Sequence, residues 1–302
     1  MRSPPIDRRR RLLGGVGAAG ALAAIGALAD AADAAEAQSA LPGRRMPVLF
    51  IGHGSPMNLV RDNAFTQFLR ALGAGLPKPA AILSVSAHWL TPGATAVGIQ
   101  DKPETIHDFG GFPPALSTFE YPARGAPMLA LETAGRVRGG SAVPTREWGL
   151  DHGTWTVLHR LYPAADVPVF QLSIDYAQPA AFHHAVGRDL AALRERGVLV
   201  MGSGNIVHNL RATDRMAPDG PPSRDWARGF DAAVQKALAG RDDAALIAYA
   251  KLDGAAMAVP TPDHYFPLLY ALGAAGPGAE AKSVFTGFQG GTLGMRCLRF
   301  DA

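Results

Sequence analysis

Apolar residues occupy mostly successive positions in four short stretches of the chain. These stretches are rich in β-branched residues or leucine, and each stops at a glycine, serine or aspartate, which is the pattern of a strand. Because the apolar residues do not alternate strictly with polar ones, both faces of each strand are expected to be covered. The predicted strands are residues 47–51, 80–85, 167–174 and 198–201.

Other segments carry apolar residues at helical spacing. Phe65 and Leu69 fall on one such stripe, and Trp155 and Leu158 fall on another. The alternation of strands and helices predicts an α/β fold, with a central mostly parallel or mixed sheet and helices on both faces. Residues 91–127 are rich in glycine and proline and are expected to form a long loop region at the active site. The predicted helices are residues 63–72, 153–161, 179–195, 224–239 and 242–252.

The amino-terminal segment has a different character. Four consecutive arginines, Arg8 to Arg11, precede two leucines and a stretch rich in glycine and alanine. This order of charged, mildly apolar and small residues predicts a secretory signal, and the arginines before leucine resemble a twin-arginine signal. We expect residues 1–37 to be the signal and residues 38–302 to be one catalytic domain. The mature protein is expected in the periplasm or outside the cell, with no stable membrane association after the signal is cleaved.

Charge and cysteine content narrow the possible partners and sites. The formal net charge is +3, from 29 basic and 26 acidic residues, and no basic stripe with interleaved aromatic residues occurs. Nucleic acid is therefore not an expected partner. The single cysteine, Cys297, excludes an internal disulfide and any metal site built on several cysteines. The nine histidines remain as candidate metal ligands.

Three of these histidines follow predicted strands. His53 comes after the first strand, His88 after the second and His208 after the fourth. Ligands of open α/β sheets bind in the crevice at the carboxyl ends of the strands, so these side chains can converge on one point. Three imidazoles can hold Zn²⁺ or Fe²⁺ and leave positions open for a substrate. The alternative, that each histidine only satisfies local hydrogen bonds, is disfavoured by three equivalent placements.

Seven ordered motifs resemble one enzyme family. Together they span essentially the whole predicted catalytic domain, and they resemble the LigB-type class III extradiol dioxygenases, in particular the 4,5-DOPA dioxygenase extradiol group. The motifs are FIGHGSPMN at 50–58, SAHW at 86–89, TIHDFGGFP at 105–113, WGLDHGTW at 148–155, QLSID at 171–175, GNIVHNLR at 204–211 and TPDHYFPLLY at 261–270.

The resemblance implies one divalent metal ion per chain, Zn²⁺ or Fe²⁺. It implies His53, His88 and His264 as ligands, with His208 as a further ligand or as a nearby catalytic base. The wider family often has a glutamate as its third ligand, where this chain has His264. An all-imidazole site resembles zinc sites as much as non-haem iron sites.

The same resemblance implies the reaction and the residues on the substrate side. The expected partners are a small aromatic diol of the DOPA type and O₂, and the ring is opened beside the diol. His208 would accept a phenolic proton, and His152 would stabilise developing negative charge. The expected substrate pocket contains His107, Phe109 and Trp89, whereas core packing is expected for Trp155.

Two other functions use the same histidines. The first is a zinc-dependent hydrolase with metal-bound water as the nucleophile, and the second is a periplasmic metal-binding protein with a closed site. The sequence leaves open the substrate, the ring bond that is cleaved, the native metal and the oligomeric state.

Overall fold

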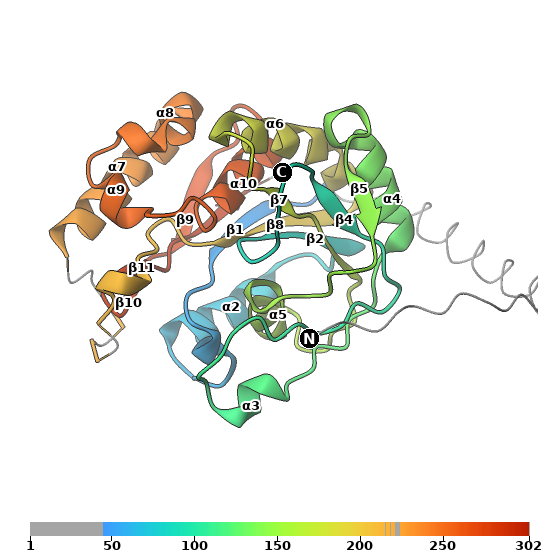
Figure 1. The fold of residues 1–302 in the computed structure, drawn as a ribbon, viewed down its shortest axis with the longest axis horizontal. Helices are drawn as coiled ribbons and strands as arrows, with labels where there is room; N and C mark the ends of the chain where they lie inside the picture. Colours follow the sequence, from blue (N-terminus) through green and yellow to red (C-terminus); the bar gives the residue numbers. More distant parts are fainter. Residues whose placement is uncertain (1–44, 215, 218, 221–223, 302) are drawn as a thin grey trace, which may run out of the picture. The chain divides into compact units, whose positions relative to one another are not determined.

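A six-stranded mixed sheet forms the centre of the fold. A computed structural model describes residues 45–214, 216–217, 219–220 and 224–301, which fall in one compact unit. The expected signal, residues 1–37, lies outside the described residues, so the boundary of the catalytic domain stays a prediction. The strand order is β6-β2-β8-β1-β12-β9 (Figure 1). Its members are β1 (Val48–Gly52), β2 (Ala81–Ser86), β6 (Val169–Gln171), β8 (Val198–Gly204), β9 (Ala281–Phe285) and β12 (Cys297–Phe300).

Strand direction divides this sheet into two parts. The strands β6, β2, β8 and β1 are parallel, with Val48 opposite Val200 in the β1–β8 pair. The strands β12 and β9 are antiparallel to their neighbours, with Val48 opposite Phe300 in the β1–β12 pair. The predicted mixed α/β sheet is therefore confirmed, and the two antiparallel strands at one edge are an addition to the strands predicted from the sequence.

Three two-stranded sheets lie outside the central one. They are formed by β3 (Leu90–Thr91) with β7 (Ile174–Asp175), β4 (Ala96–Gly98) with β5 (Val143–Thr145), and β10 (Phe288–Gln289) with β11 (Leu293–Gly294). The prediction of one strand over 167–174 was wrong, because this segment contains β6 and the first residue of β7. Beyond β6 the chain leaves β2, and Ser173 bonds to Ala96 through both its backbone N–H and its side-chain hydroxyl, at 2.8 and 2.7 Å. Because residues 169–171 pair with β2 and Ser173 bonds to β4, the predicted strand is interrupted between β6 and β7.

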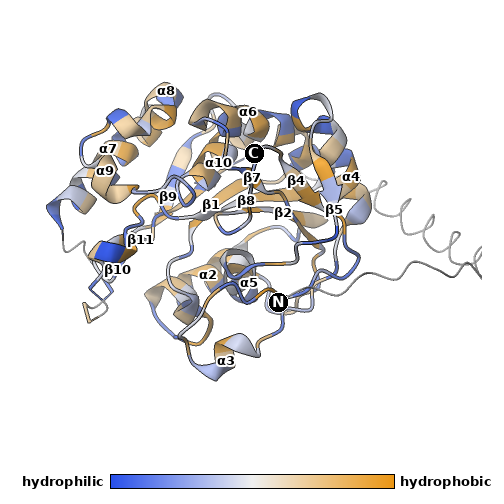
Figure 2. Ribbon diagram, in the orientation of Figure 1, coloured by the Kyte–Doolittle hydropathy of each residue, from blue (hydrophilic) through white to orange (hydrophobic). Residues whose placement is uncertain are grey.

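Helices cover both faces of the central sheet, as predicted. On β1, Leu49 and Ile51 pack in one core cluster with α2 and α5, whereas Val48 and Phe50 pack in the other with α6 and α10. Figure 2 shows the central strands as predominantly hydrophobic. The α-helices are α2 (Ala64–Gly75), α3 (Pro114–Ser117), α4 (Pro127–Arg136), α5 (His152–Leu161), α6 (Ala180–Leu190), α7 (Asp225–Ala239), α8 (Asp243–Ile247), α9 (Ala255–Ala258) and α10 (Phe266–Ala275).

Several predicted elements end differently in the structure. The 179–195 helix changes from α6 to a 3₁₀ helix, and the 242–252 helix divides into α8 and another 3₁₀ helix. The expected loop at 91–127 contains β4 and α3. Asn63 is the N-cap of α2 and forms a capping box with Thr66, which sets the start of that helix. The 3₁₀ helices are η1 (Pro56–Leu59), η2 (Val137–Gly139), η3 (Ala191–Arg196), η4 (Leu210–Ala212) and η5 (Tyr249–Lys251).

Helix α10 brings the segment before it to the carboxyl end of β8. All ten residues of this helix are buried between the sheet and α6. A Cβ atom on Gly204 would lie 2.2 Å from the carbonyl oxygen of His264, and one on Gly202 would lie 2.3 Å from that of Pro267. Glycine at both positions therefore permits the close approach of α10 to β8. None of the helices in the described part of the chain is long and apolar enough to cross a membrane.

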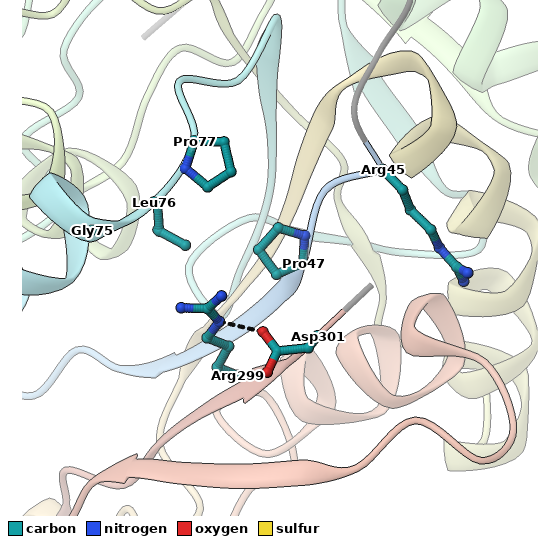
Figure 3. A pocket seen from close by; sticks show the side chains of 7 residues that line it. All are labelled: Arg45, Pro47, Gly75, Leu76, Pro77, Arg299 and Asp301. Atoms are coloured by element: carbon teal, nitrogen blue, oxygen red, sulfur yellow. Dashed lines mark hydrogen bonds and ion pairs between the residues drawn. The ribbon is translucent and has the colours of Figure 1, made fainter.

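A hollow of about 370 Å³ lies at the opposite end of the sheet from the histidines that follow the strands (Figure 3). It adjoins Arg45 and Pro47 before β1, and Arg299 and Asp301 at the end of β12. The two charged groups near the end of β12 form an ion pair with each other. The hollow contains no histidine and takes no part in the site described below.

The interface between α6 and α10 contains a buried histidine that makes stability depend on pH. His183 is fully buried, with Nδ1 3.0 Å from the Tyr270 hydroxyl and Nε2 3.2 Å from the Gln178 carbonyl oxygen. Burial lowers the pKa of His183 from 6.5 to about 4, against the smaller opposing effects of the Gln178 carbonyl and Asp175. The folded chain therefore holds this imidazole neutral at a pH where the unfolded chain would protonate it.

We expect the free energy of unfolding to fall as the pH falls from about 6.5 to about 4. In this window the unfolded chain binds more protons at this position, so His183 contributes a loss of up to about 1.4 kcal/mol per pH unit. Urea unfolding of the wild type and of His183→Gln measures the contribution, because the other buried histidines remain in both proteins. Equal pH slopes in the two proteins would contradict the assignment.

Candidate metal centre and its neighbouring histidines

Three histidines from distant parts of the chain meet at the carboxyl ends of the parallel strands. His53 follows β1, His88 follows β2, and His264 precedes α10 beside the end of β8. One ligating nitrogen from each lies within 4.8 Å of the other two. The convergence expected from the strand ends is present for His53 and His88, but the third member of this group is His264 rather than His208. Their assignment as ligands stays a prediction to be tested.

A hydrogen-bond chain determines which nitrogen of His53 is free. The Ser203 hydroxyl on β8 donates to the Gly153 carbonyl oxygen at 2.6 Å. The hydroxyl has one hydrogen to donate, so its oxygen acts as the acceptor toward Nδ1 of His53 at 3.0 Å. His53 thus carries its hydrogen on Nδ1 and has an unprotonated Nε2.

Carboxylates orient the other two histidines in the same way. Nδ1 of His88 is 3.2 Å from Oδ2 of Asp108, and Nδ1 of His264 bonds to Oδ2 of Asp263. Burial is the largest single effect and opposes ionisation of both acids, but hydrogen bonds and charge interactions with His152 at Asp108, and with His264 at Asp263, together outweigh it and lower the pKa of each carboxyl. An ionised carboxylate attracts an N–H and repels a lone pair, so Nδ1 is the nitrogen that carries the hydrogen in neutral His88 and neutral His264, which leaves Nε2 free.

The distance between two of these free nitrogens fits a shared cation. Nε2 of His53 and Nε2 of His88 are 3.2 Å apart. With both hydrogens on Nδ1, the two lone pairs repel each other unless a positive charge lies between them. Two nitrogens bound at about 2.0–2.1 Å to one tetrahedral ion lie roughly 3.3 Å apart. The donor set therefore fits a divalent metal held by imidazoles.

Burial keeps these ligands in the form that binds metal. It lowers the pKa of His53 and of His88 well below the usual value, and the neighbouring histidines lower both further. Protonation would compete with metal binding, so neutral imidazoles favour it. Each side chain is also oriented through its second nitrogen, as is common for metal-binding histidines.

His208 lies beside this group without belonging to it. Its ring stacks on that of His264 with centroids 3.5 Å apart and planes at 4°, and one of its nitrogens groups with a carboxylate oxygen of Asp263 and a nitrogen of His264. Burial, followed by the proximity of His264, lowers the pKa of His208 to about 3. A neutral imidazole has a free lone pair for a proton or for a metal ion, so the choice between base and ligand stays a prediction.

His152 lies next to His88 and His53. It is the first residue of α5, whose N-cap is Asp151. Its Nδ1 is 2.9 Å from Oδ2 of Asp108, and its ring centroid is 3.8 Å from that of His88. Nε2 of His152 thus remains available on the side away from the carboxylate. The structure therefore places this predicted catalytic residue next to the predicted ligands.

The three expected pocket residues have different surroundings. The Phe109 ring meets the His152 ring edge-on, with centroids 5.4 Å apart. Nε2 of His107 donates to the Phe119 carbonyl oxygen at 2.9 Å, which leaves this histidine engaged in holding its loop. Trp89 is buried and stacks on Trp148 with centroids 6.0 Å apart, so packing already accounts for its position. All three substrate roles stay predictions, and Phe109 is the best placed of them.

Trp155 is fully buried and donates from Nε1 to the Ile106 carbonyl oxygen, as expected of a core residue.

Sequence reasoning missed Ser203, Asp108 and Asp263, the three partners of the candidate ligands. Two of them adjoin histidines in the chain, at His107-Asp108 and Asp263-His264. Searching for acceptors of the second ring nitrogen of each ligand would have raised them as candidates.

Comparison with known proteins identifies the family of the chain. Residues 48–292 match the family described as the catalytic LigB subunit of aromatic ring-opening dioxygenase. The match spans most of the chain, and the chain therefore belongs to this family of ring-opening enzymes.

Individual relatives carry a more specific description. A protein of Escherichia coli K12 described as 4,5-DOPA dioxygenase extradiol is 48% identical over 234 residues, which cover 76% of this chain and 85% of that protein. One of Beta vulgaris with the same description is 36% identical over 264 residues, covering 84% and 96%. The crystal structure of an uncharacterized Escherichia coli K12 protein matches with a TM-score of 0.73 and 39% identity, covering 85% of this chain and all of that one.

Proposed function

We propose that this chain is a metal-dependent extradiol dioxygenase that opens the ring of a DOPA-like catechol with O₂. The observation that carries the proposal is the pair of Nε2 atoms of His53 and His88, 3.2 Å apart, with His264 completing the group. Family membership supports the ring-opening class, and the description of the relatives as 4,5-DOPA dioxygenases supports a DOPA-like substrate.

His53, His88 and His264 would hold the ion, which is Fe²⁺ or Zn²⁺ by its donor set. When bound, a redox-active divalent ion supplies Lewis acidity toward the diol and a route for electrons from the ring to O₂. Imidazole ligands carry no negative charge, so they would leave the charge of the ion available to an anionic catechol. Their second nitrogens are all engaged with Ser203, Asp108 or Asp263, which keeps the rings from rotating.

Two further histidines would handle protons and charge. His208, neutral and stacked on His264, would accept a phenolic proton of the bound diol at its free nitrogen. Asp108 would stabilise His152 when that imidazole is doubly protonated, so that its Nε2–H can donate to negative charge that develops on the oxygens. Phe109, in edge-on contact with His152, would offer an apolar surface against which the aromatic ring of the substrate packs.

The test is ring opening by purified protein reconstituted with Fe²⁺ under air. DOPA and a panel of other catechols are expected to give a yellow ring-opened product with uptake of one O₂ per ring. Zinc-loaded protein is the matched sample and is expected to be inactive in ring opening. Iron-loaded protein that is inert on the whole panel, together with zinc-loaded protein that hydrolyses an ester or amide, would favour the hydrolase alternative.

A further inference from the structure

One carboxylate joins a candidate metal ligand to a candidate catalytic histidine. Oδ2 of Asp108 lies 2.9 Å from Nδ1 of His152 and 3.2 Å from Nδ1 of His88. Oδ1 of the same side chain accepts the backbone N–H of His152 at 2.9 Å. We infer that Asp108 is a positioning residue that sets the orientation and tautomer of both histidines at once. The inference rests on the proposed function, because it concerns the residues of that site.

The inference follows from the single oxygen that both imidazoles share. A carboxylate oxygen can only accept, so each imidazole directs an Nδ1–H toward it and, in its neutral form, leaves Nε2 unprotonated. Neutral His88 then has a lone pair for the metal, and neutral His152 can take up the second proton with which it would donate to negative charge. Because both Nδ1 atoms lie within 3.2 Å of the same oxygen and the ring centroids are 3.8 Å apart, rotation of either ring would disturb the surroundings of the other.

Backbone hydrogen bonds anchor the segment before Asp108, so the carboxylate has a defined position. The segment before it pairs with the residues that precede α5: the Ile106 N–H donates to the Leu150 carbonyl oxygen, and the Leu150 N–H donates to that of Glu104, both at 2.7 Å. The Ile106 carbonyl oxygen also accepts Nε1–H of Trp155 at 2.9 Å. This anchoring reduces the freedom of Asp108 and fixes the loop to the start of α5.

The other partners of the ligands do not have this double role. Ser203 orients only His53, and Asp263 bonds only to His264 among the site histidines of the described chain. The nearby Asp151 is fully buried but engages Ser86 and Gln171 instead, at 2.6 and 2.7 Å. Asp108 is therefore the group whose alteration should affect metal binding and the substrate-side histidine together.

The variant Asp108→Asn tests whether the hydrogen-bond acceptors of Asp108, rather than the size of its side chain, orient the two histidines. The variant keeps the size of the side chain but replaces one acceptor oxygen with an NH₂ donor. If the amide oxygen faces the two imidazoles, the NH₂ opposes the backbone N–H of His152. If the NH₂ faces the imidazoles, both must accept at Nδ1 and carry their hydrogens on Nε2. His88 in that tautomer cannot bind a metal through Nε2.

The experiment compares wild type, Asp108→Asn and the control Asp243→Asn. The control removes a carboxylate that also faces a histidine, with Oδ2 3.3 Å from Nε2 of His184 on α6. Zinc affinity is measured by competition with a chelator, and histidine tautomers are read from long-range ¹H–¹⁵N spectra of metal-free protein. Thermal unfolding checks that each variant is folded.

We expect Asp108→Asn to weaken zinc binding by roughly 10- to 100-fold, the usual effect of removing such a partner, and to change the tautomers of His88 and His152. The control should match wild type in both measurements. Asp108→Glu, which remains a pure acceptor, should keep the Nδ1–H tautomers. Unchanged zinc affinity and tautomers in Asp108→Asn, or loss of the tautomers in Asp108→Glu as well, would overturn the inference. If wild type binds no zinc, the proposed function fails, while the metal-free spectra still decide the role of Asp108.

Discussion

His53→Ala is expected to abolish ring opening and to weaken metal binding by more than about 100-fold. Removing only the partner of a metal ligand typically costs about 10- to 100-fold in affinity, so removing the ligand itself should cost more. His53 contributes one of the two Nε2 atoms that lie 3.2 Å apart. Its loss leaves His88 and His264, and two imidazoles hold a divalent ion poorly.

Zinc-induced stabilisation measures this effect without any assay of ring opening. A ligand at 100 times its dissociation constant stabilises the folded chain by about 2.7 kcal/mol. Wild type should show this increase in the free energy of unfolding, and His53→Ala should not. His159→Ala is the matched control, because His159 lies on α5 with its ring 4.9 Å from Phe119 and belongs to none of the ligand groups found among the described residues. Stabilisation of His53→Ala by zinc to the wild-type extent would contradict the assignment of this ligand.

His208→Ala is expected to lower kcat by about 10²- to 10⁴-fold, the range that a general base contributes. Metal affinity should change little, because the nitrogens of His208 lie outside the group formed by His53, His88 and His264. The combination of a lower kcat with retained metal is the expected result for a base. Metal content after dialysis and steady-state kinetics on a catechol measure the two quantities separately.

The same variant distinguishes the two roles that the family resemblance leaves open for His208. If His208 is a ligand, metal affinity and kcat should fall together, as in His53→Ala. His208→Gln serves as a second variant, because it fills more of the space beside the stacked His264 ring and cannot accept the proton as imidazole does. Wild-type kcat in either variant would exclude the proposed base.

Much of the fold could be predicted from local patterns, and the failures have identifiable causes. The apolar runs at β1, β2 and β8 were found because strands covered on both faces have few polar residues. Helix α10 was not found, because all of its residues are buried and its apolar residues show no one-sided period. The run at 167–174 was predicted as one strand, since its change of partner at Ser173 depends on β4, which is distant in sequence.

The order of residues along the chain is enough to name the candidate residues of the site. Histidines that follow strands, and the ordered motifs around them, are sufficient to propose a metal and to name its candidate ligands. Local order along the chain carries this information, because the carboxyl ends of parallel strands meet at one edge of a sheet. How close these histidines come to one another, and which nitrogen each one presents, follow from the tertiary structure. Those properties depend on Ser203, Asp108 and Asp263 as acceptors, and Ser203 and Asp108 reach their histidines only when distant segments pack together.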